Sequence, residues 1–385
     1  MRSRPGTAVF FGHAVPVQAV TFVLRPTATY RAVELDVPTH WLGALAASFA
    51  IVPLVLAVPS GHAADRFGER RVMVVGSLLV LLSSAAFVLL ADSVGGIVLA
   101  SVVLGLGHLC SVVGQQAMVA NGTPRERYDT AFGHYTFATS VGQAVGPGLI
   151  VLFGGEATIP RTSDIFLWAT GLTVVLVVLS LLLPRTRGHA GTVQGAGGSV
   201  RDLLRKPGLV RALTVSCVVL AAVDITLVYL PALGAERGIV AGTVGLLLTL
   251  RATASMTSRL FLGRLVAWMG RRRLLLGSLA LSATSLALTP VPMPQWLLGV
   301  VVVLLGLGLG AGQPLTMSLL AETTPPGMRG RAMSLRLTGN RLGQVLVPSA
   351  AGLLAVGAGA SGVLALTAAG LASVGVAARR LHTDP

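Results

Sequence analysis

Two charged residues lie inside long apolar stretches of the sequence, where charge is costly. Asp224 is the only acid deep within any such stretch, and Arg251 lies in the next stretch along the chain. An ionisable side chain in the hydrocarbon core of a membrane usually faces a partner or a water-filled path. Counting back from the connection between the two stretches brings both residues within about two helical turns of the same depth. We therefore expect Asp224 and Arg251 to pair.

Such a pair has two uses. Protonation of Asp224 would release Arg251, and this is the chemistry that a proton-coupled switch needs. A permanent structural ion pair fits the same residues equally well. Arg259 and Arg341 add positive charge to the same half of the chain. This excess indicates an anionic or acid-bearing substrate, unless helix-end carbonyl groups satisfy each guanidinium, and it makes Arg251 and Arg341 candidate substrate-binding residues.

Membrane-spanning helices must position these side chains. The chain of 385 residues is 53% hydrophobic and only 11% charged, with a mean hydropathy of +0.79, which excludes a soluble surface. Apolar runs of roughly 20 residues are long enough to cross a bilayer, and they predict an all-α membrane protein with twelve transmembrane helices. The runs cover residues 7–27, 38–59, 72–91, 95–118, 131–153, 165–184, 209–231, 239–264, 274–290, 296–319, 332–354 and 360–378.

The net charge of +15 is explained by topology. On the twelve-helix map the arginines gather on one side of the membrane, and the other side holds only Arg25, Arg31, Arg161 and Arg237. The positive-inside rule then places both termini and the long central connection in the cytoplasm. We therefore expect a multi-pass protein of the inner (plasma) membrane, with no nucleic-acid partner.

The chain contains an internal repeat. Residues 185–208 form the only long polar, glycine-rich stretch, which predicts a cytoplasmic linker between an N-terminal six-helix bundle (residues 1–184) and a C-terminal six-helix bundle (residues 209–385). An ordered series of matches at offsets of about 201 to 202 residues predicts that the bundles are pseudo-symmetric. The matching pairs include Gly68 and Gly270, Gly105 and Gly306, Gly107 and Gly308, Gly142 and Gly343, and Pro147 and Pro348.

One motif occurs in both halves between apolar runs. GHAADRFGERR extends from Gly61 to Arg71, and GRLVAWMGRRR extends from Gly263 to Arg273. The first copy resembles the signature loop of the major facilitator superfamily of secondary transporters. Together with the predicted spans, the central connection and the repeat, the resemblance covers essentially the whole chain.

The first copy is a candidate gating loop. Its glycines allow a sharp bend, and its arginines hold it at the cytoplasmic face. The resemblance implies that Asp65 lies against the start of a helix of the other half, near Arg331, and helps to latch the cytoplasmic side shut. Because Ala267 and Trp268 replace the acid and its arginine in the second copy, we predict a one-sided latch, although both copies would also serve simply to set topology. The candidates are Gly61, Asp65, Arg66, Gly68, Arg70 and Arg71.

The run 131–153 carries a second motif. Gly133, Gly142, Gly146 and Pro147 resemble the family's antiporter signature, although the closing glycine pair arrives three positions late. Gly142 and Gly146 lie one turn apart, where they permit close packing of another helix, and Pro147 bends the helix. The resemblance implies export in exchange for protons, and a packing kink in a rocking helix is the alternative.

The resemblance also implies that the first, fourth, seventh and tenth helices line the transport path. His13 and His108 lie on two of them, and because histidine titrates near neutral pH they join Asp224 as proton-coupling candidates. The alternative for each histidine is a hydrogen-bonded packing role. Four polar residues on these helices are further substrate-binding candidates: Gln18, Gln115, Tyr229 and Gln313.

These features predict a secondary active transporter that moves a small organic molecule by alternating access. We favour proton-coupled efflux, with proton-symport import of a small organic or anionic solute as the alternative and a non-transporting membrane sensor as a third possibility. No phosphate-binding loop, HExxH or GxSxG pattern occurs, so we expect no enzyme. We also expect no cofactor, no metal and a monomer in the bilayer.

Overall fold

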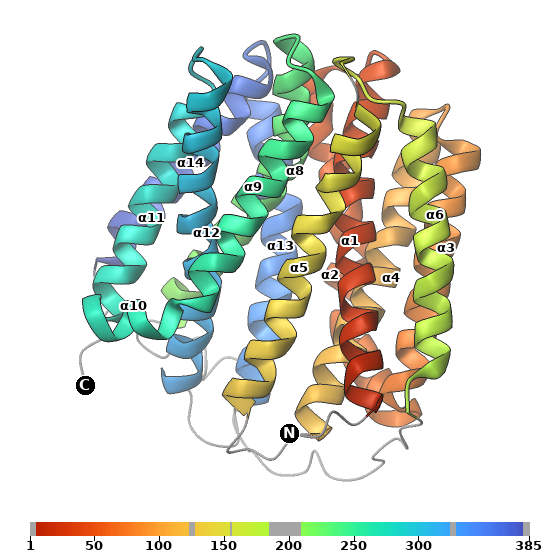
Figure 1. Cartoon of the computed structure of the whole chain (residues 1–385). Helices are drawn as coiled ribbons and strands as arrows, with labels where there is room; N and C mark the ends of the chain where they lie inside the picture. The colour runs from red at the N-terminus through yellow and green to blue at the C-terminus, as the bar shows by residue number, and fades with distance from the viewer. Residues whose placement is uncertain (1–4, 123–127, 155, 185–208, 324–328, 380–385) are drawn as a thin grey trace. The chain divides into compact units, whose positions relative to one another are not determined.

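The computed structural model describes residues 5–122, 128–154, 156–184, 209–323 and 329–379, and in these ranges the chain is helical (Figure 1). The predicted all-α class is confirmed, and the predicted linker, residues 185–208, lies outside the described residues. A short 3₁₀ helix, η1 (Thr39–Trp41), precedes α2. The α-helices are α1 (Pro5–Glu34), α2 (Leu42–Phe67), α3 (Glu69–Leu90), α4 (Val94–Gly122), α5 (Tyr128–Gly154), α6 (Thr162–Leu182), α8 (Leu209–Glu236), α9 (Ala241–Leu260), α10 (Leu262–Met269), α11 (Arg271–Leu288), α12 (Gln295–Thr323), α13 (Arg329–Leu354) and α14 (Gly359–Ala378).

Eight of the described helices are long and apolar enough to cross a membrane: α2, α3, α4, α5, α6, α8, α12 and α14. The other long helices, α1, α9, α11 and α13, are more polar along their length. They hold many of the residues that the sequence singles out, including His13 in α1, Arg251 in α9 and Arg341 in α13. The candidate residues are divided between the two kinds of helix, since Asp224 lies on α8 and His108 lies on α4.

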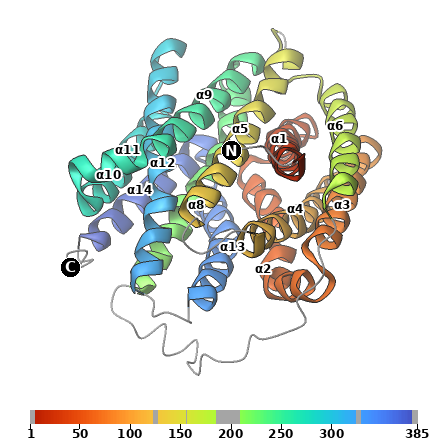
Figure 2. The ribbon, with the colours of Figure 1, turned by 60° about the horizontal axis from the view of Figure 1, so that its bottom comes forward.

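The described chain forms two compact units, and the first comprises Met1–Pro38, Ser48–Gly191 and Gly234–Thr249. Within it, α1 packs against α5 and α6, and α3 packs against α4 and α6 (Figure 2). Phe87 of α3 stacks on Phe166 of α6 with ring centroids 5.0 Å apart. An apolar cluster near the start of α1 includes Phe10, Met73 and Tyr135. These contacts hold α1 against α3, α5 and α6.

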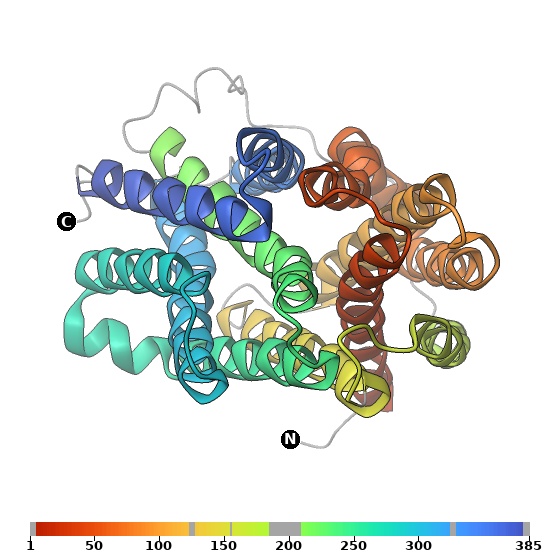
Figure 3. The same cartoon turned by 90° about the horizontal axis from the view of Figure 1, so that it is seen from above.

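The second unit comprises Thr39–Ala47, Thr192–Leu233 and Leu250–Pro385. Within it, α11 packs against α12 and α14, and α13 contacts α12, α14 and η1 (Figure 3). The predicted run 239–264 is broken at Phe261, where α9 ends and the short α10 begins.

Close helix contacts recur in the two units at the spacing of the sequence repeat. A Cβ atom added to Gly107 in α4 would lie 2.9 Å from the carbonyl oxygen of Gly76 in α3. The matching glycine of the second unit, Gly308 in α12, would meet the carbonyl oxygen of Ser278 in α11 at 2.8 Å. Both glycine positions are thus required by a near contact between helices, as expected of the internal repeat in the sequence.

The predicted gating loop is mostly helical. We expected bends at both Gly61 and Gly68, but α2 continues through Phe67, and Gly61 lies inside this helix with no atom within 4 Å of an added Cβ. The expectation for Gly61 was wrong because the alanine-rich segment after it continues the backbone ladder, which ends with the Gly68 N–H donating to Ala64 O at 3.0 Å. Of these two glycines, only Gly68 interrupts the helix, with a φ of 89°. Its counterpart Gly270 has a φ of 78° immediately before α11.

Candidate functional site

Asp224 and Arg251 lie in the interior of the second unit. Asp224 on α8 is 3% exposed and Arg251 on α9 is 2% exposed. The two charges interact electrostatically, and Arg259, two turns further along α9, acts on Arg251 as a like charge. Among the described residues, no hydrogen bond reaches Nε of Arg251. The Asp224 carboxylate therefore supplies a favourable interaction for a guanidinium that is buried beside a second cation.

Helix packing positions this pair. Gly306 of α12 lies directly against the backbone carbonyl of Arg251, so α9 and α12 approach closely at this level. One turn further toward the end of α9, Ser255 donates to the carbonyl oxygen of Gly306 at 2.8 Å. Nε of Arg259 donates to the carbonyl oxygen of Gly310 at 3.4 Å. The carbonyl that binds Arg259 lies in the middle of α12, whereas the alternative from the sequence named carbonyls at helix ends.

The arginines of α13 have neighbours of their own. Arg341 is 5% exposed and donates through Nη1 to Oε1 of Gln344 at 2.8 Å. Arg336 donates to Ser216 Oγ of α8 at 3.3 Å, and Ser216 donates to Oδ1 of Asn340 at 2.9 Å. These bonds join α8 to α13 through polar groups. The arginines also make the interior of the second unit rich in positive charge.

Two other candidates of the second unit lie on α8 and α12. Tyr229 of α8 is fully buried, and its hydroxyl oxygen would lie 3.0 Å from a Cβ added to Gly43 and 3.2 Å from one added to Gly352. Gln313 of α12 is half-buried, and its carbonyl oxygen accepts a hydrogen bond from Thr316 at 2.8 Å. Tyr229 is therefore held by tight packing against two glycines.

In the first unit, three helices contribute to one chain of hydrogen bonds. Tyr135 of α5 donates to Oε1 of Gln115 on α4 at 3.0 Å, and Nε2 of Gln115 lies 2.9 Å from Nδ1 of His13 on α1. His13 and Gln115 are both fully buried. Sequence reasoning named His13 and Gln115 separately and missed Tyr135, because the pairing depends on helix faces that a single sequence does not define.

A second polar group lies nearer the other end of α1. Nδ1 of His108 on α4 is 3.1 Å from Oγ1 of Thr21, and the His108 ring lies beside that of Phe49 on α2. The guanidinium of Arg25 stacks over the other partner, Phe49, with Cζ 4.5 Å from the ring centroid. The twelve-helix map assigns Arg25 to the side of the membrane opposite the cytoplasm. In the structure it is 7% exposed within α1, which continues to Glu34.

The glycines of α5 pack against α1. An added Cβ on Gly142 would lie 2.7 Å from Cβ of Gln18, and one on Gly146 would lie 2.5 Å from the carbonyl oxygen of Ala19. Gln18 in turn accepts a hydrogen bond from Gln143 at 3.4 Å. Pro147 is buried inside α5, and Gly133 lies in its first half. The α5 motif thus makes a close helix contact.

Two arginines that follow the breaking glycines bind helix ends. Arg70 donates to the carbonyl oxygen of Leu181 at the end of α6, and Arg272 in the second unit donates to that of Arg379, next to α14, at 2.7 Å. Cationic groups at a helix C-terminus are favourable. Arg66 and Arg71 are exposed, and Arg66 lies over the ring of Phe67. The side chains of Asp65 and Arg331 lie outside the described residues, so the latch stays a prediction.

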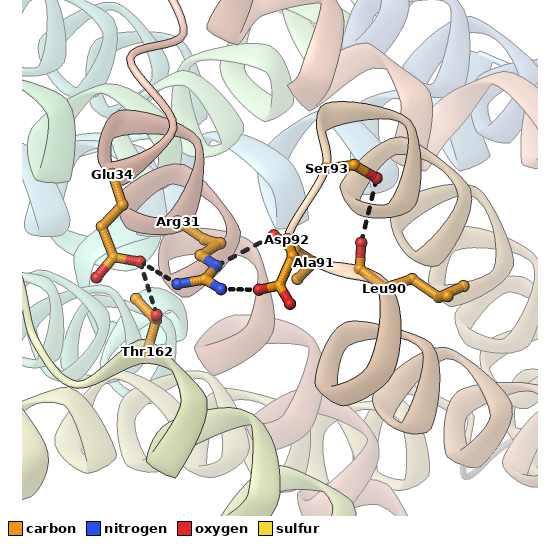
Figure 4. A network of polar contacts seen from close by, with 7 residues as sticks. All are labelled: Arg31, Glu34, Leu90, Ala91, Asp92, Ser93 and Thr162. Atoms are coloured by element: carbon orange, nitrogen blue, oxygen red, sulfur yellow. Dashed lines mark hydrogen bonds and ion pairs between the residues drawn. The ribbon is translucent and has the colours of Figure 1, made fainter.

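A network that sequence reasoning missed ties three helix ends of the first unit (Figure 4). Arg31 of α1 donates to Glu34 at 2.8 Å, to the carbonyl oxygen of Ala91 at 3.1 Å and to Asp92. Thr162 of α6 donates to Glu34 at 2.9 Å. The hydrogen bond to Glu34 and the charge of Asp92 raise the pKa of Arg31 above its ordinary value. The partners lie far apart in the sequence, so no local pattern predicts the network.

The helices, their apolar exteriors and the buried charges define an integral, multi-pass membrane protein. The family model of the Major Facilitator Superfamily matches residues 11–239 and 212–385, and the chain belongs to this superfamily. Its members are transporters, so a small-molecule substrate and a membrane environment follow from the family. Among the described residues, no group of three or more His, Cys, Asp and Glu gathers as metal ligands would.

Individual relatives agree with this assignment. Multidrug resistance protein 1 of Bacillus subtilis (strain 168) is 26% identical over 152 residues, which cover 40% of this chain and 38% of that protein. The fold is similar to that of the nucleoside transporter NupG, with a TM-score of 0.74 at 15% identity over 99% of this chain and 100% of that one. It is also similar to a POT family transporter in complex with 5-aminolevulinic acid, with a TM-score of 0.77 at 12% identity over 96% and 94% of the chains.

Proposed function

We propose that this protein is a secondary active transporter that exports a small organic molecule in exchange for protons, with Asp224 as the coupling residue and Arg251 as its partner. The observation that carries the proposal is the buried Asp224–Arg251 interaction beside Arg259. The guanidinium of Arg251 favours the ionised form of a carboxylate in this position, and protonation of the carboxylate would remove the attraction between them.

The proposed cycle follows from the charges. With Asp224 ionised, the repulsion between Arg251 and Arg259 is offset. Protonation of Asp224 removes that compensation and leaves the two guanidinium groups acting on each other within α9, so the packing of α8 against α9 becomes less favourable. A proton thereby biases one arrangement of the helices over another, which is what alternating access around a central site requires.

Two further features support export. The relative whose name specifies multidrug resistance is similar over 152 residues. The α5 glycines of the antiporter-like motif lie against α1.

We propose twelve spans, counting α9 and α10 as one, in bundles of residues 1–184 and 209–385, with both termini in the cytoplasm and a monomer in the inner (plasma) membrane. The Asp65 latch belongs to the same proposal.

A second candidate is the import of an anionic solute by proton symport. The buried arginines of the second unit favour it, since Arg251 and Arg341 are both at most 5% exposed and Asp224 is the acid beside the first of them. In this case the substrate anion would replace part of the role of Asp224. His108 stays a proton-coupling candidate, and Gln18, Gln115, Tyr229 and Gln313 stay proposed contacts of the substrate in either direction.

Transport by the purified protein in liposomes tests the proposal. Ethidium, an organic cation, and carboxyfluorescein, an organic anion, are offered with and without a pH gradient. Proton-driven movement of ethidium that Asp224→Asn abolishes supports export, and proton-driven accumulation of carboxyfluorescein supports the second candidate. Asp164→Asn is the matched control, because Asp164 is exposed and paired with Arg161. Gradient-dependent transport by Asp224→Asn at the wild-type rate would contradict both versions.

A further inference from the structure

The hydrogen bonds of the first unit determine where two buried histidines carry their protons. A neutral imidazole has one N–H donor and one acceptor nitrogen, and its neighbours decide which is which. His13 and His108 both use Nδ1 for their described hydrogen bond, but they face opposite kinds of neighbour.

The hydrogen-bond chain that ends at His13 starts with the hydroxyl donor of Tyr135. A carboxamide oxygen only accepts, so the hydroxyl of Tyr135 donates to Oε1 of Gln115, and the NH₂ group of Gln115 then faces His13. With the Gln115 carboxamide in this orientation, Nδ1 of His13 accepts the bond, which puts the proton of the neutral ring on Nε2.

For His108 the order is reversed. The single hydroxyl proton of Thr21 goes to the carbonyl oxygen of Val17 at 2.8 Å, so Thr21 Oγ1 can only accept from the ring. Nδ1 of His108, 3.1 Å away, carries the proton that it donates. The two histidines thus differ in tautomer although both lie between α1 and α4.

The Nε2–H group of His13 is a buried donor with no hydrogen-bond partner among the described residues. The residue is fully buried. Its one described hydrogen bond is to an amide, so among the described residues no carboxylate hydrogen-bonds to an imidazolium there. Phe10, Ala14 and Tyr135 belong to the apolar cluster on the same helices, with the rings of Phe10 and Tyr135 centred 6.1 Å apart.

We propose that His13 is a fixed hydrogen-bond donor for the transported molecule, selecting aromatic, apolar compounds that carry an acceptor oxygen such as a ketone or amide carbonyl, and that it is not the carrier of the coupled proton. Gln115 and Tyr135 act as positioning residues that hold the donor tautomer. An unpaired buried N–H is costly, and a ligand oxygen that accepts from it removes this cost. An ammonium group has no lone pair to offer and gains nothing there. The inference rests on the proposed function only in that a small organic molecule is the substrate.

The tautomer is tested first, by ¹⁵N NMR of histidine-labelled protein in lipid nanodiscs. The His13 signals are assigned from their absence in His13→Phe, which keeps an apolar ring. We expect a protonated Nε2 and an unprotonated Nδ1 that stay unchanged over the pH range of activity, and the opposite pattern for neutral His108. Tyr135→Phe should release the Gln115 amide and give His13 a mixture of tautomers. A protonated Nδ1, or titration of His13 in that range, would overturn the proposal.

The ligand class is tested with benzophenone and diphenylmethane, which differ by one carbonyl oxygen. In the wild type we expect benzophenone to bind about threefold to tenfold more tightly, the range for one neutral hydrogen bond, and to shift the His13 Nε2–H resonance. His13→Phe should abolish the difference, whereas His134→Phe, a substitution of an exposed histidine on α5, should keep it. Equal affinities in the wild type, or an unshifted resonance at saturation, would refute the site. Binding is measured without a proton gradient, so failure of proton-coupled export would leave this result unaffected.

Discussion

The contact of α5 with α1 gives a prediction whose size can be worked from the structure. A Cβ atom at Gly146 would lie 2.5 Å from the carbonyl oxygen of Ala19 and 3.1 Å from Cβ of Phe22. Because the nearer atom is backbone, relief requires the two helices to separate, and such overpacking costs typically about 1 to 3 kcal/mol. Alanine also gains up to about 1 kcal/mol over glycine from helix propensity, which offsets part of the cost.

Gly171 of α6 isolates the packing cost, because an added Cβ there meets no atom within 4 Å. Both Gly→Ala changes carry the same propensity gain, so the free energy of unfolding of Gly146→Ala should fall below that of Gly171→Ala by about 1 to 3 kcal/mol. The measurement is equilibrium unfolding of the purified protein in mixed micelles with increasing SDS. Equal stability of the two variants would refute close packing of α5 on α1.

Three other predictions follow from the structure. Gly68→Ala and Gly270→Ala should each lower the free energy of unfolding by about 1 to 2 kcal/mol, since both glycines have positive φ. Gly61→Ala and Gly263→Ala should not lower it, because an added Cβ there meets open space. The same SDS titration compares the four variants, and a loss at Gly61 as large as at Gly68 would contradict the helix break at Gly68. Asp224→Asn and Arg251→Gln should each destabilise by about 3 to 5 kcal/mol, because each single change removes the opposite charge from a buried ionised residue. The double variant should lose less than the sum of the two. Strict additivity in this cycle would mean that the two charges do not interact. Arg31→Gln should increase hydrogen exchange at the network ends of α1, α3 and α6 and lower the free energy of unfolding by about 1 kcal/mol, as for a partly exposed network. Arg161→Gln removes an exposed pair and should change neither quantity. Unchanged exchange in Arg31→Gln would show that the network does not hold these ends.

Some of the fold was predictable because its causes are local or periodic. Hydropathy marks the apolar helices, and the repeat offset pairs Gly68 with Gly270, which both adopt positive φ. Depth counting brings Asp224 near Arg251, and the structure has their charges interacting. Glycine alone did not locate the bends, since Gly61 stays helical where the surrounding alanines continue the ladder.

The rest depends on which face each helix turns toward its neighbours. Tyr135 completes the His13 chain from a third helix, and Arg25 lies over the ring of Phe49, which belongs to another helix. The Arg31 network joins residues more than a hundred positions apart at its extremes, as in the bond of Thr162 to Glu34. A single sequence carries the residue types of these contacts but not the helix rotations that create them.

Infrared titration of the wild type and Asp224→Asn most directly tests whether Asp224 exchanges a proton. Acidification of the wild type should produce the carbonyl stretching band of a newly protonated carboxylic acid in an apolar environment. The account predicts that this band is lost in Asp224→Asn and kept in the exposed control Asp164→Asn. A band that persists unchanged in Asp224→Asn would contradict the assignment of Asp224 as the coupling residue.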